Sequence, residues 1–292
     1  MDTLSRQALP LNFPQSFLPE RSLLAKIFAF AAQNGAGNKL EIMQQTGIPT
    51  GESTGKVEPM IGYAQGMGLI QASQHKGHWQ LGLTPLGQSI FQEDRYLHES
   101  QTQWLLHLLL CRRLDLSVPA TGLADAWFAI FAESHYRLGK CFKIEELLHF
   151  VSERHQQPKY VPDLVRLVVR SYQQASCFKA VGAIREVEQA EHLLLERGSA
   201  PTDTSYFPFY AAFLYLVWDD LFAGESQLAL EQLAAESRCF LLLGWTDSAI
   251  NRWLYWLGDQ GWLQLDRHTG TPVLLRLRTT GQLLEKLYSE ML

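Results

Sequence analysis

The side chains best suited to an ionic contact gather in residues 154–185. This stretch holds six cations and a single acid, Asp163, so its net charge is +5. The cations are Arg154, Lys159, Arg166, Arg170, Lys179 and Arg185. Arg166 and Arg170 are four residues apart, so a helix would place them on one face. Two interpretations are open: a contact with nucleic-acid phosphates, or a solvent-exposed face paired with the acids that follow, Glu186, Glu188, Glu191 and Glu196.

A second candidate for phosphate contact is the segment Gly51-Glu-Ser-Thr-Gly55-Lys56. A nucleotide-binding loop needs four residues between its glycines and Ser or Thr after the lysine, whereas here three residues intervene and Val57 follows. An inter-helix turn is therefore favoured. If the next helix contacts DNA, Ser53, Thr54 and Lys56 lie at its N-terminus, where hydroxyls, backbone N–H groups and one cation suit a phosphate.

Acidic and sulfur-containing groups offer only weak catalytic candidates. Asp219 and Asp220 could bind Mg²⁺ with a distant partner, and Asp94, His98 and Glu99 form another possible cluster. His107 and Cys111 share a helix face, where core packing is favoured over metal binding. The four cysteines form no CxxC pair, which indicates reduced thiols. We expect no metal site and no cofactor, and no catalytic residue is assigned.

Two regions of the sequence share one pattern of elements. Residues 60–70 (MIGYAQGMGLI) and 253–263 (WLYWLGDQGWL) each read as a helix that ends at glycine. Each is followed by a short hairpin and a further helix, which is typical of a winged helix-turn-helix. In the first copy the third helix begins near Thr54 or Gly55. In the second copy the preceding helix spans residues 227–242, and Thr246 caps the helix 247–257.

The expected hairpins, or wings, carry a few basic side chains. The first wing has His75, Lys76 and His78, and the second has Arg267, His268, Arg276 and Arg278. Both terminal regions are close to neutral, because residues 1–95 hold seven cations and seven acids and residues 226–292 hold six and seven. DNA binding and a protein-interaction role for the winged helices are therefore both open.

These elements predict a mainly α protein with winged helix-turn-helix domains at both ends flanking a helical middle region. The expected domains are residues 1–95, residues 96–225 and residues 226–292. Prolines at 119, 158, 162, 201 and 208 separate the helices of the middle domain.

Composition limits the class of protein. The chain has 292 residues, 47% hydrophobic and 19% charged, which excludes a disordered chain. Its net charge of -5 excludes a uniformly cationic nucleic-acid binder and leaves room for a local basic patch. The most apolar run, residues 206–218, is too short to span a bilayer. With no signal peptide visible, we expect a cytoplasmic protein without membrane contact.

Several segments resemble a known family. They include SFLPERSLLAKIF, LTPLGQSIFQED, QTQWLLHLLLC and VPDLVRLVVRSY, of which the middle WLLH and DLVRLVVRSY segments are the most distinctive. The sequence resembles the domain of unknown function 4007 family, which includes SspB-like proteins encoded beside DNA phosphorothioation genes. The resemblance covers most of the chain.

The resemblance implies a component of a bacterial modification or defence module. Its partners there would be DNA, an ATPase, a sulfurtransferase-like enzyme and a cysteine desulfurase. We expect the chain to bind DNA and to recruit or position these enzymes. The alternatives are a metal-dependent DNA nickase, an activity proposed for SspB-like proteins, a protein–protein adaptor, and a transcriptional regulator, which would need a two-fold dimer and a palindromic site.

Overall fold

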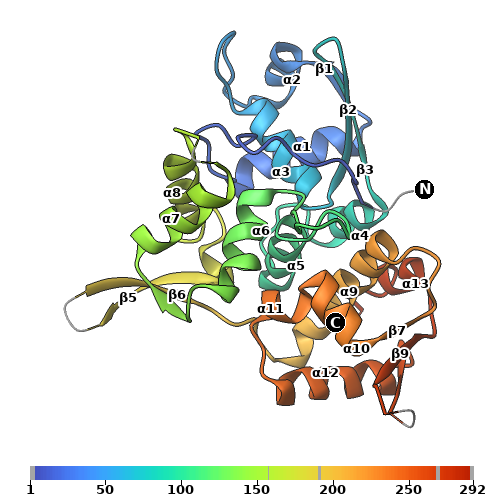
Figure 1. The fold of residues 1–292 in the computed structure, drawn as a ribbon. Coiled ribbons are helices and arrows are strands. Elements are labelled where there is room, and N and C mark those ends of the chain that lie inside the picture. Colours follow the sequence, from blue (N-terminus) through green and yellow to red (C-terminus); the bar gives the residue numbers. More distant parts are fainter. Residues whose placement is uncertain (1–3, 157, 190–191, 268–269, 290–292) are drawn as a thin grey trace.

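The computed structural model describes residues 4–156, 158–189, 192–267 and 270–289 (Figure 1). Within these residues the fold is mixed α/β, with 13 α-helices and three small antiparallel sheets of three strands each. The expectation of a mainly α fold with a purely helical middle region is therefore wrong in one respect. The middle region contains one of the sheets, because residues 184–197 form a hairpin that pairs with Cys141–Phe142.

The first sheet belongs to a group of elements that we call unit A. Strand β1 pairs with β3, and β3 pairs with β2, so the strand order is β1-β3-β2. The elements are α1 (Arg21–Ala32), β1 (Ala36–Asn38), α2 (Lys39–Thr46), α3 (Val57–Gly66), β2 (Ile70–His75), β3 (His78–Leu83) and α4 (Pro85–Glu93). Helix α5 (Ser100–Leu110) follows and is buried along most of its length.

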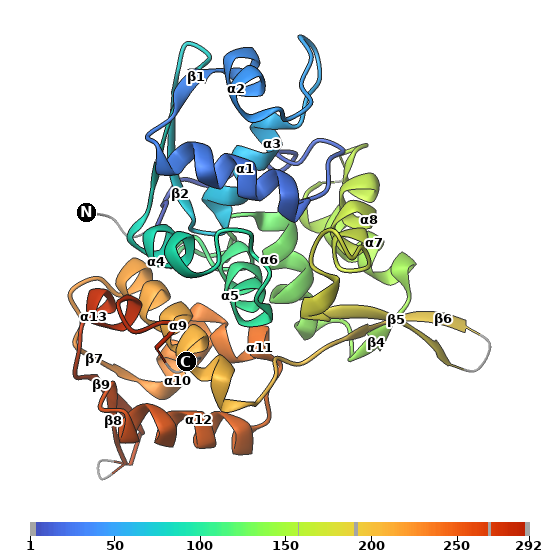
Figure 2. The same cartoon turned by 180° about the vertical axis from the view of Figure 1, so that it is seen from behind.

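The second sheet belongs to unit B, in the region expected to be helical. Its strand order is β4-β6-β5. The elements are α6 (Asp125–Phe131), β4 (Cys141–Phe142), α7 (Ile144–Arg154), α8 (Val161–Ser171), β5 (Ile184–Gln189) and β6 (His192–Arg197). Short 3-10 turns lie at Glu133–Tyr136 and Lys179–Val181. Strands β5 and β6 extend away from the rest of the molecule in both views (Figures 1 and 2).

The third sheet belongs to unit C and has the strand order β7-β9-β8. The elements are α9 (Phe207–Leu221), β7 (Gln227–Ala229), α10 (Leu230–Ser237), α11 (Cys239–Leu243), α12 (Asp247–Asp259), β8 (Leu263–Asp266), β9 (Val273–Arg276) and α13 (Thr280–Leu284). The single helix expected over residues 227–242 is wrong. Residues 227–229 are a strand, and Arg238, with a φ of 61°, separates two helices.

The three units repeat one order of elements. In each, a helix precedes a short strand, further helices follow, and a hairpin returns to pair its second strand with the first strand of the unit. Local signals match this order in detail. The Thr246 hydroxyl accepts a hydrogen bond from the Ala249 backbone N–H and caps α12, as predicted. Helix α3 begins at Val57, so Pro59 lies in its first turn, where a missing N–H costs least.

One continuous hydrophobic core joins the three units. Helices α5 and α9 pack against each other at its centre, and α9 also packs against α13 and α10. Helix α9, expected in the middle domain, therefore contributes to the packing of unit C. The domain boundaries at residues 95/96 and 225/226 stay a prediction. No helix of the described residues combines the length and the apolar character that a membrane span requires.

Candidate nucleic-acid interface

Helix α3 lies where a winged helix would have its recognition helix, yet it is buried on nearly every side. Its buried residues are Val57, Pro59, Met60, Ile61, Gly62, Tyr63, Ala64 and Gly66. The Tyr63 ring packs edge-to-face on Trp127 of α6, with 5.6 Å between ring centroids. Its hydroxyl donates to the Phe17 carbonyl at 3.0 Å. The body of α3 therefore offers no continuous face to a ligand.

The loop before α3 is more accessible. Ser53 and Thr54 are exposed and precede the helix, rather than forming its first turn. The Lys56 ammonium lies 2.6 Å from Glu20 Oε1, with both side chains about one-third exposed. Lys56 is thus already paired, whereas the two hydroxyls face solvent. On the first wing, His75 and Lys76 are exposed at the tip of the β2–β3 hairpin.

Helix α8, the corresponding helix of unit B, presents one polar stripe to solvent. Asp163, Arg166 and Arg170 are exposed, at spacings of three and four residues. The opposite faces are buried through Leu164, Val165, Leu167 and Val168. This alternation is what an amphipathic helix requires, because positions three and four apart share a face. Arg166 Nη1 lies 3.3 Å from Asp163 Oδ1, and both side chains are mostly exposed.

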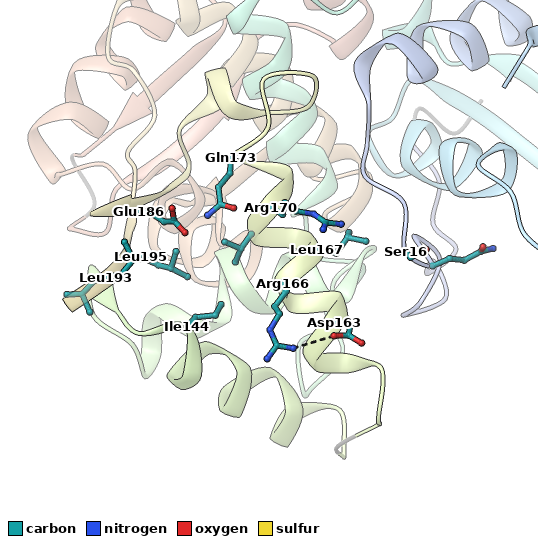
Figure 3. A pocket seen from close by; sticks show the side chains of 13 residues that line it. Ser16, Ile144, Asp163, Arg166, Leu167, Arg170, Gln173, Glu186, Leu193 and Leu195 are labelled. Atoms are coloured by element: carbon teal, nitrogen blue, oxygen red, sulfur yellow. Dashed lines mark hydrogen bonds and ion pairs between the residues drawn. The ribbon is translucent and has the colours of Figure 1, made fainter. Parts of the chain in front are cut away.

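A groove of about 620 Å³ runs beside this stripe, between α8 and the β5–β6 hairpin (Figure 3). Leu167, Leu193 and Leu195 supply apolar surface, and Leu193 is 60% exposed. Arg166, Arg170, Gln173 and Glu186 supply polar groups. Gln15 and Ser16 of the N-terminal segment also line it. The groove therefore has the exposed stripe of α8 on one side and the β5–β6 hairpin on the other.

The predicted basic stretch divides into two classes. Arg154 is occupied, because its guanidinium bonds to Asp125 at 3.0 Å and to the Ala120 carbonyl at 2.6 Å. Arg185 is exposed but lies 2.7 Å from Glu196, as the paired interpretation predicted. The remaining members are exposed: Lys159, Arg166, Arg170 and Lys179. Of these, only Arg166 forms an ion pair with a described residue. Glu191 lies outside the described residues.

The basic residues of the second wing likewise differ in how exposed they are and in which partners they contact. Arg276 is mostly buried, pairs with Asp219 and lies over the Tyr215 ring at 4.4 Å. Arg278 lies over Trp262 at 4.8 Å. Arg267 is exposed, bonds to Asn251 Oδ1 and lies over Tyr255 of α12 at 5.5 Å. His268 lies outside the described residues. Sequence reasoning missed Tyr255, which is 57% exposed on α12.

The acids considered for metal binding have other partners. Asp219 accepts hydrogen bonds from Arg276 and Thr280. Asp220 pairs with Arg6 at 3.0 Å and lies 3.8 Å from the buried Arg112 guanidinium. Asp94 accepts the backbone N–H groups of His98 and Glu99. No group of three His, Cys, Asp or Glu side chains among the described residues is arranged to hold a metal ion.

His107 and Cys111 are core residues, as expected. The His107 Nδ1 atom lies 2.7 Å from the Tyr172 hydroxyl and 3.6 Å from Cys111 Sγ, and all three side chains are buried. Burial lowers the pKa of His107 to about 3, because the interior disfavours the charged imidazolium. Burial likewise raises the pKa of the Cys111 thiol. The cluster has no exposed reactive group.

Comparison with known proteins places the fold. No protein-family model and no curated protein matches this sequence. A magnesium ion-bound SspB crystal structure matches with a TM-score of 0.70 and 18% identity, covering 96% of this chain and 87% of that chain. An SspB crystal structure matches with a TM-score of 0.69 and 17% identity, covering 99% and 89%. The chain has an SspB-like fold. Membership of the domain of unknown function 4007 family stays a prediction.

Proposed function

We propose that this chain is a DNA-binding component of a bacterial phosphorothioation-type modification or defence system. Its three repeated units are winged helices, and unit B makes the main contact. The observation that carries this proposal is the exposed stripe of α8, where Arg166 and Arg170 lie beside the groove formed with the β5–β6 hairpin. The SspB-like fold supports the cellular context.

The contact is electrostatic in its main part. Lys159, Arg166, Arg170 and Lys179 are exposed on or next to α8, and Asp163 is the one acid on the exposed stripe of that helix. Cations of this kind bind DNA phosphates and release counterions, so affinity falls as salt rises. The acids of the hairpin, Glu186 and Glu188, disfavour phosphate on that side. DNA therefore approaches along α8 rather than along the tip of the hairpin.

Other exposed groups extend the contact. Ser53, Thr54, His75 and Lys76 in unit A and Arg267 in unit C are accessible to a phosphate. Lys56, Arg154 and Arg276 would contribute through their local structure, because each is already paired with a carboxylate, whereas Arg278 forms no ion pair among the described residues. In this role the protein holds DNA while the ATPase, the sulfurtransferase-like enzyme and the cysteine desulfurase of the module act.

Fluorescence anisotropy with a labelled duplex, over a range of salt concentrations, tests the proposal. The double variant R166E/R170E should lower affinity at low salt by at least about tenfold and reduce the salt slope by about two. The matched control is K26E/R95E, which reverses two exposed cations of unit A. Equal effects of both variants would overturn the assignment to α8.

Anisotropy at low salt, together with a plasmid-relaxation assay, distinguishes the rival roles. A protein–protein adaptor predicts no measurable affinity for DNA at low salt, in the wild type as in the variants. A metal-dependent nickase predicts relaxation of supercoiled plasmid in Mg²⁺ or Mn²⁺. Asp219 and Asp220 are poor candidates for the metal ligands of such a nickase, because their carboxylate oxygens already bind arginine and threonine side chains.

A further inference from the structure

Unit C contains a cavity that is separate from the groove beside α8. It has a volume of about 310 Å³, at the lower end of the range for small-molecule sites. Helices α9, α12 and α13 form its walls together with the turn that follows α12. The side chains that matter for its chemistry are Trp256, Trp262, Arg278 and Lys286.

Two indole rings form the aromatic part of the wall. Trp262 is largely buried and Trp256 is half-buried. The Trp256 ring is held edge-to-face against Phe207, with 5.5 Å between centroids. Packing of this kind fixes the orientation of the ring, so its surface is available without a large entropy cost. The Trp262 ring is mostly covered by Arg278 and Tyr215, so the rigid Trp256 surface is the part of the wall that favours a flat, aromatic ligand.

The two charged side chains on the described wall are both cationic. Among the described residues, Arg278 and Lys286 form no ion pair and no carboxylate lines the cavity. Glu285, the nearest acid in sequence, lines a different hollow between α4 and α13. Arg276, two residues before Arg278, has Asp219 as its partner. Two cations that have no acidic partner in the described part of the chain, placed around a concave aromatic surface, favour an anionic ligand.

Arg278 has a defined position in this cavity. Its guanidinium lies over the Trp262 ring at 4.8 Å, a cation–π contact that orients its donors. Gly261, with a φ of 65°, passes close by, and a Cβ atom there would lie 3.4 Å from Arg278 Nη2. The turn thus leaves space for the guanidinium at the edge of the cavity.

We propose that this cavity binds a nucleoside 5′-phosphate, with the base against Trp256 and the phosphate between Arg278 and Lys286. The ligand is either a free nucleotide or the 5′-terminal nucleotide of a DNA strand. The proposal does not depend on the contact through α8, because the two sites share no residue.

Isothermal titration calorimetry with the full chain tests the site, using dAMP, deoxyadenosine and inorganic phosphate as probes. We expect dAMP to bind more tightly than either fragment. R278A/K286A should weaken dAMP binding at least tenfold, and W256A about fivefold or more, in line with the contribution of one base stacked on an aromatic ring. Circular dichroism shows whether each variant is folded.

The control variant is K26A/R95A, which removes two exposed cations of unit A that do not line the cavity and should leave dAMP binding unchanged. Tighter binding of a 5′-phosphorylated than of a 5′-hydroxyl single strand would identify a strand end as the source, and binding of dAMP alone would identify a free nucleotide. Equal affinity for dAMP and inorganic phosphate, or unchanged binding by folded R278A/K286A, would overturn the proposal.

Discussion

Helices α3 and α8 occupy the same place in two units with the same strand order, but they differ in what surrounds them. Helix α3 packs on the N-terminal segment, α5 and α6, and its residues with any exposure are Glu58 and Gln65. Helix α8 packs on α7 and α6 through its apolar side and presents Asp163, Arg166 and Arg170 to solvent. A shared topology thus places a helix without deciding whether it faces a ligand.

The side chains of each helix account for this difference. Helix α3 reads VEPMIGYAQG and has apolar or small residues at every position except Glu58 and Gln65, which is typical of a mostly buried helix. Helix α8 reads VPDLVRLVVRS and places its charged residues three and four apart. Helix α3 therefore belongs to the core of the protein, whereas α8 presents a charged stripe to solvent. If the two helices were equivalent, corresponding substitutions in each would have the same effect.

The largest loss of stability should come from removing a buried aromatic ring of α3. Tyr63→Ala removes a buried ring that contacts Phe13 and Trp127 and a hydroxyl that bonds to Phe17. We expect a loss of about 3–5 kcal/mol in the free energy of unfolding, measured by urea titration. Tyr255→Ala on the exposed face of α12 is the matched control and should change stability by less than about 1 kcal/mol. Similar losses would show that α12 is buried in solution.

The second effect is the pH dependence of stability that arises from the buried His107 of α5. The folded His107 imidazole has a pKa of about 3, against an ordinary value of 6.5, so it stays neutral while the unfolded chain binds a proton. Stability is therefore lost as pH falls below about 6.5, by about 2 kcal/mol at pH 5. Urea titrations at pH 7 and pH 5 should show a smaller pH-dependent loss in His107→Gln than in the wild type. Equal losses in the two proteins would contradict the burial of His107.

The smallest expected changes in stability come from substituting two helical glycines. A Cβ atom on Gly62 of α3 would lie 2.7 Å from the Phe13 ring, whereas one on Gly258 of α12 has its nearest neighbour at 3.7 Å. Gly62→Ala should cost up to about 2 kcal/mol, because overpacking outweighs the gain in helix propensity. Gly258→Ala should stabilise the protein by about 0.5–1 kcal/mol. Thermal unfolding measures both, and a gain for Gly62→Ala would show that the N-terminal segment packs loosely on α3.

Local patterns determined much of this protein from the sequence alone. The helix over residues 247–257, its Thr246 cap and the hairpins of units A and C all follow from spacing and capping over a few residues. The shared face of Arg166 and Arg170 follows from the helical period. The sheet of unit B escaped notice because β4 has only two residues and its partner β6 lies more than fifty residues later.

Tertiary structure alone decided which charged groups are available. Arg154 and Arg276 are as basic in the sequence as Arg166, but Asp125 and Asp219, far away in the chain, occupy them. The burial of α3 depends on Phe13, Phe17 and Trp127, which are brought together from separate segments. Helical period and capping act within one or two turns, whereas pairing and burial depend on long-range contacts. The sequence therefore determined where the helices and charges are, and the fold decided which of them face solvent.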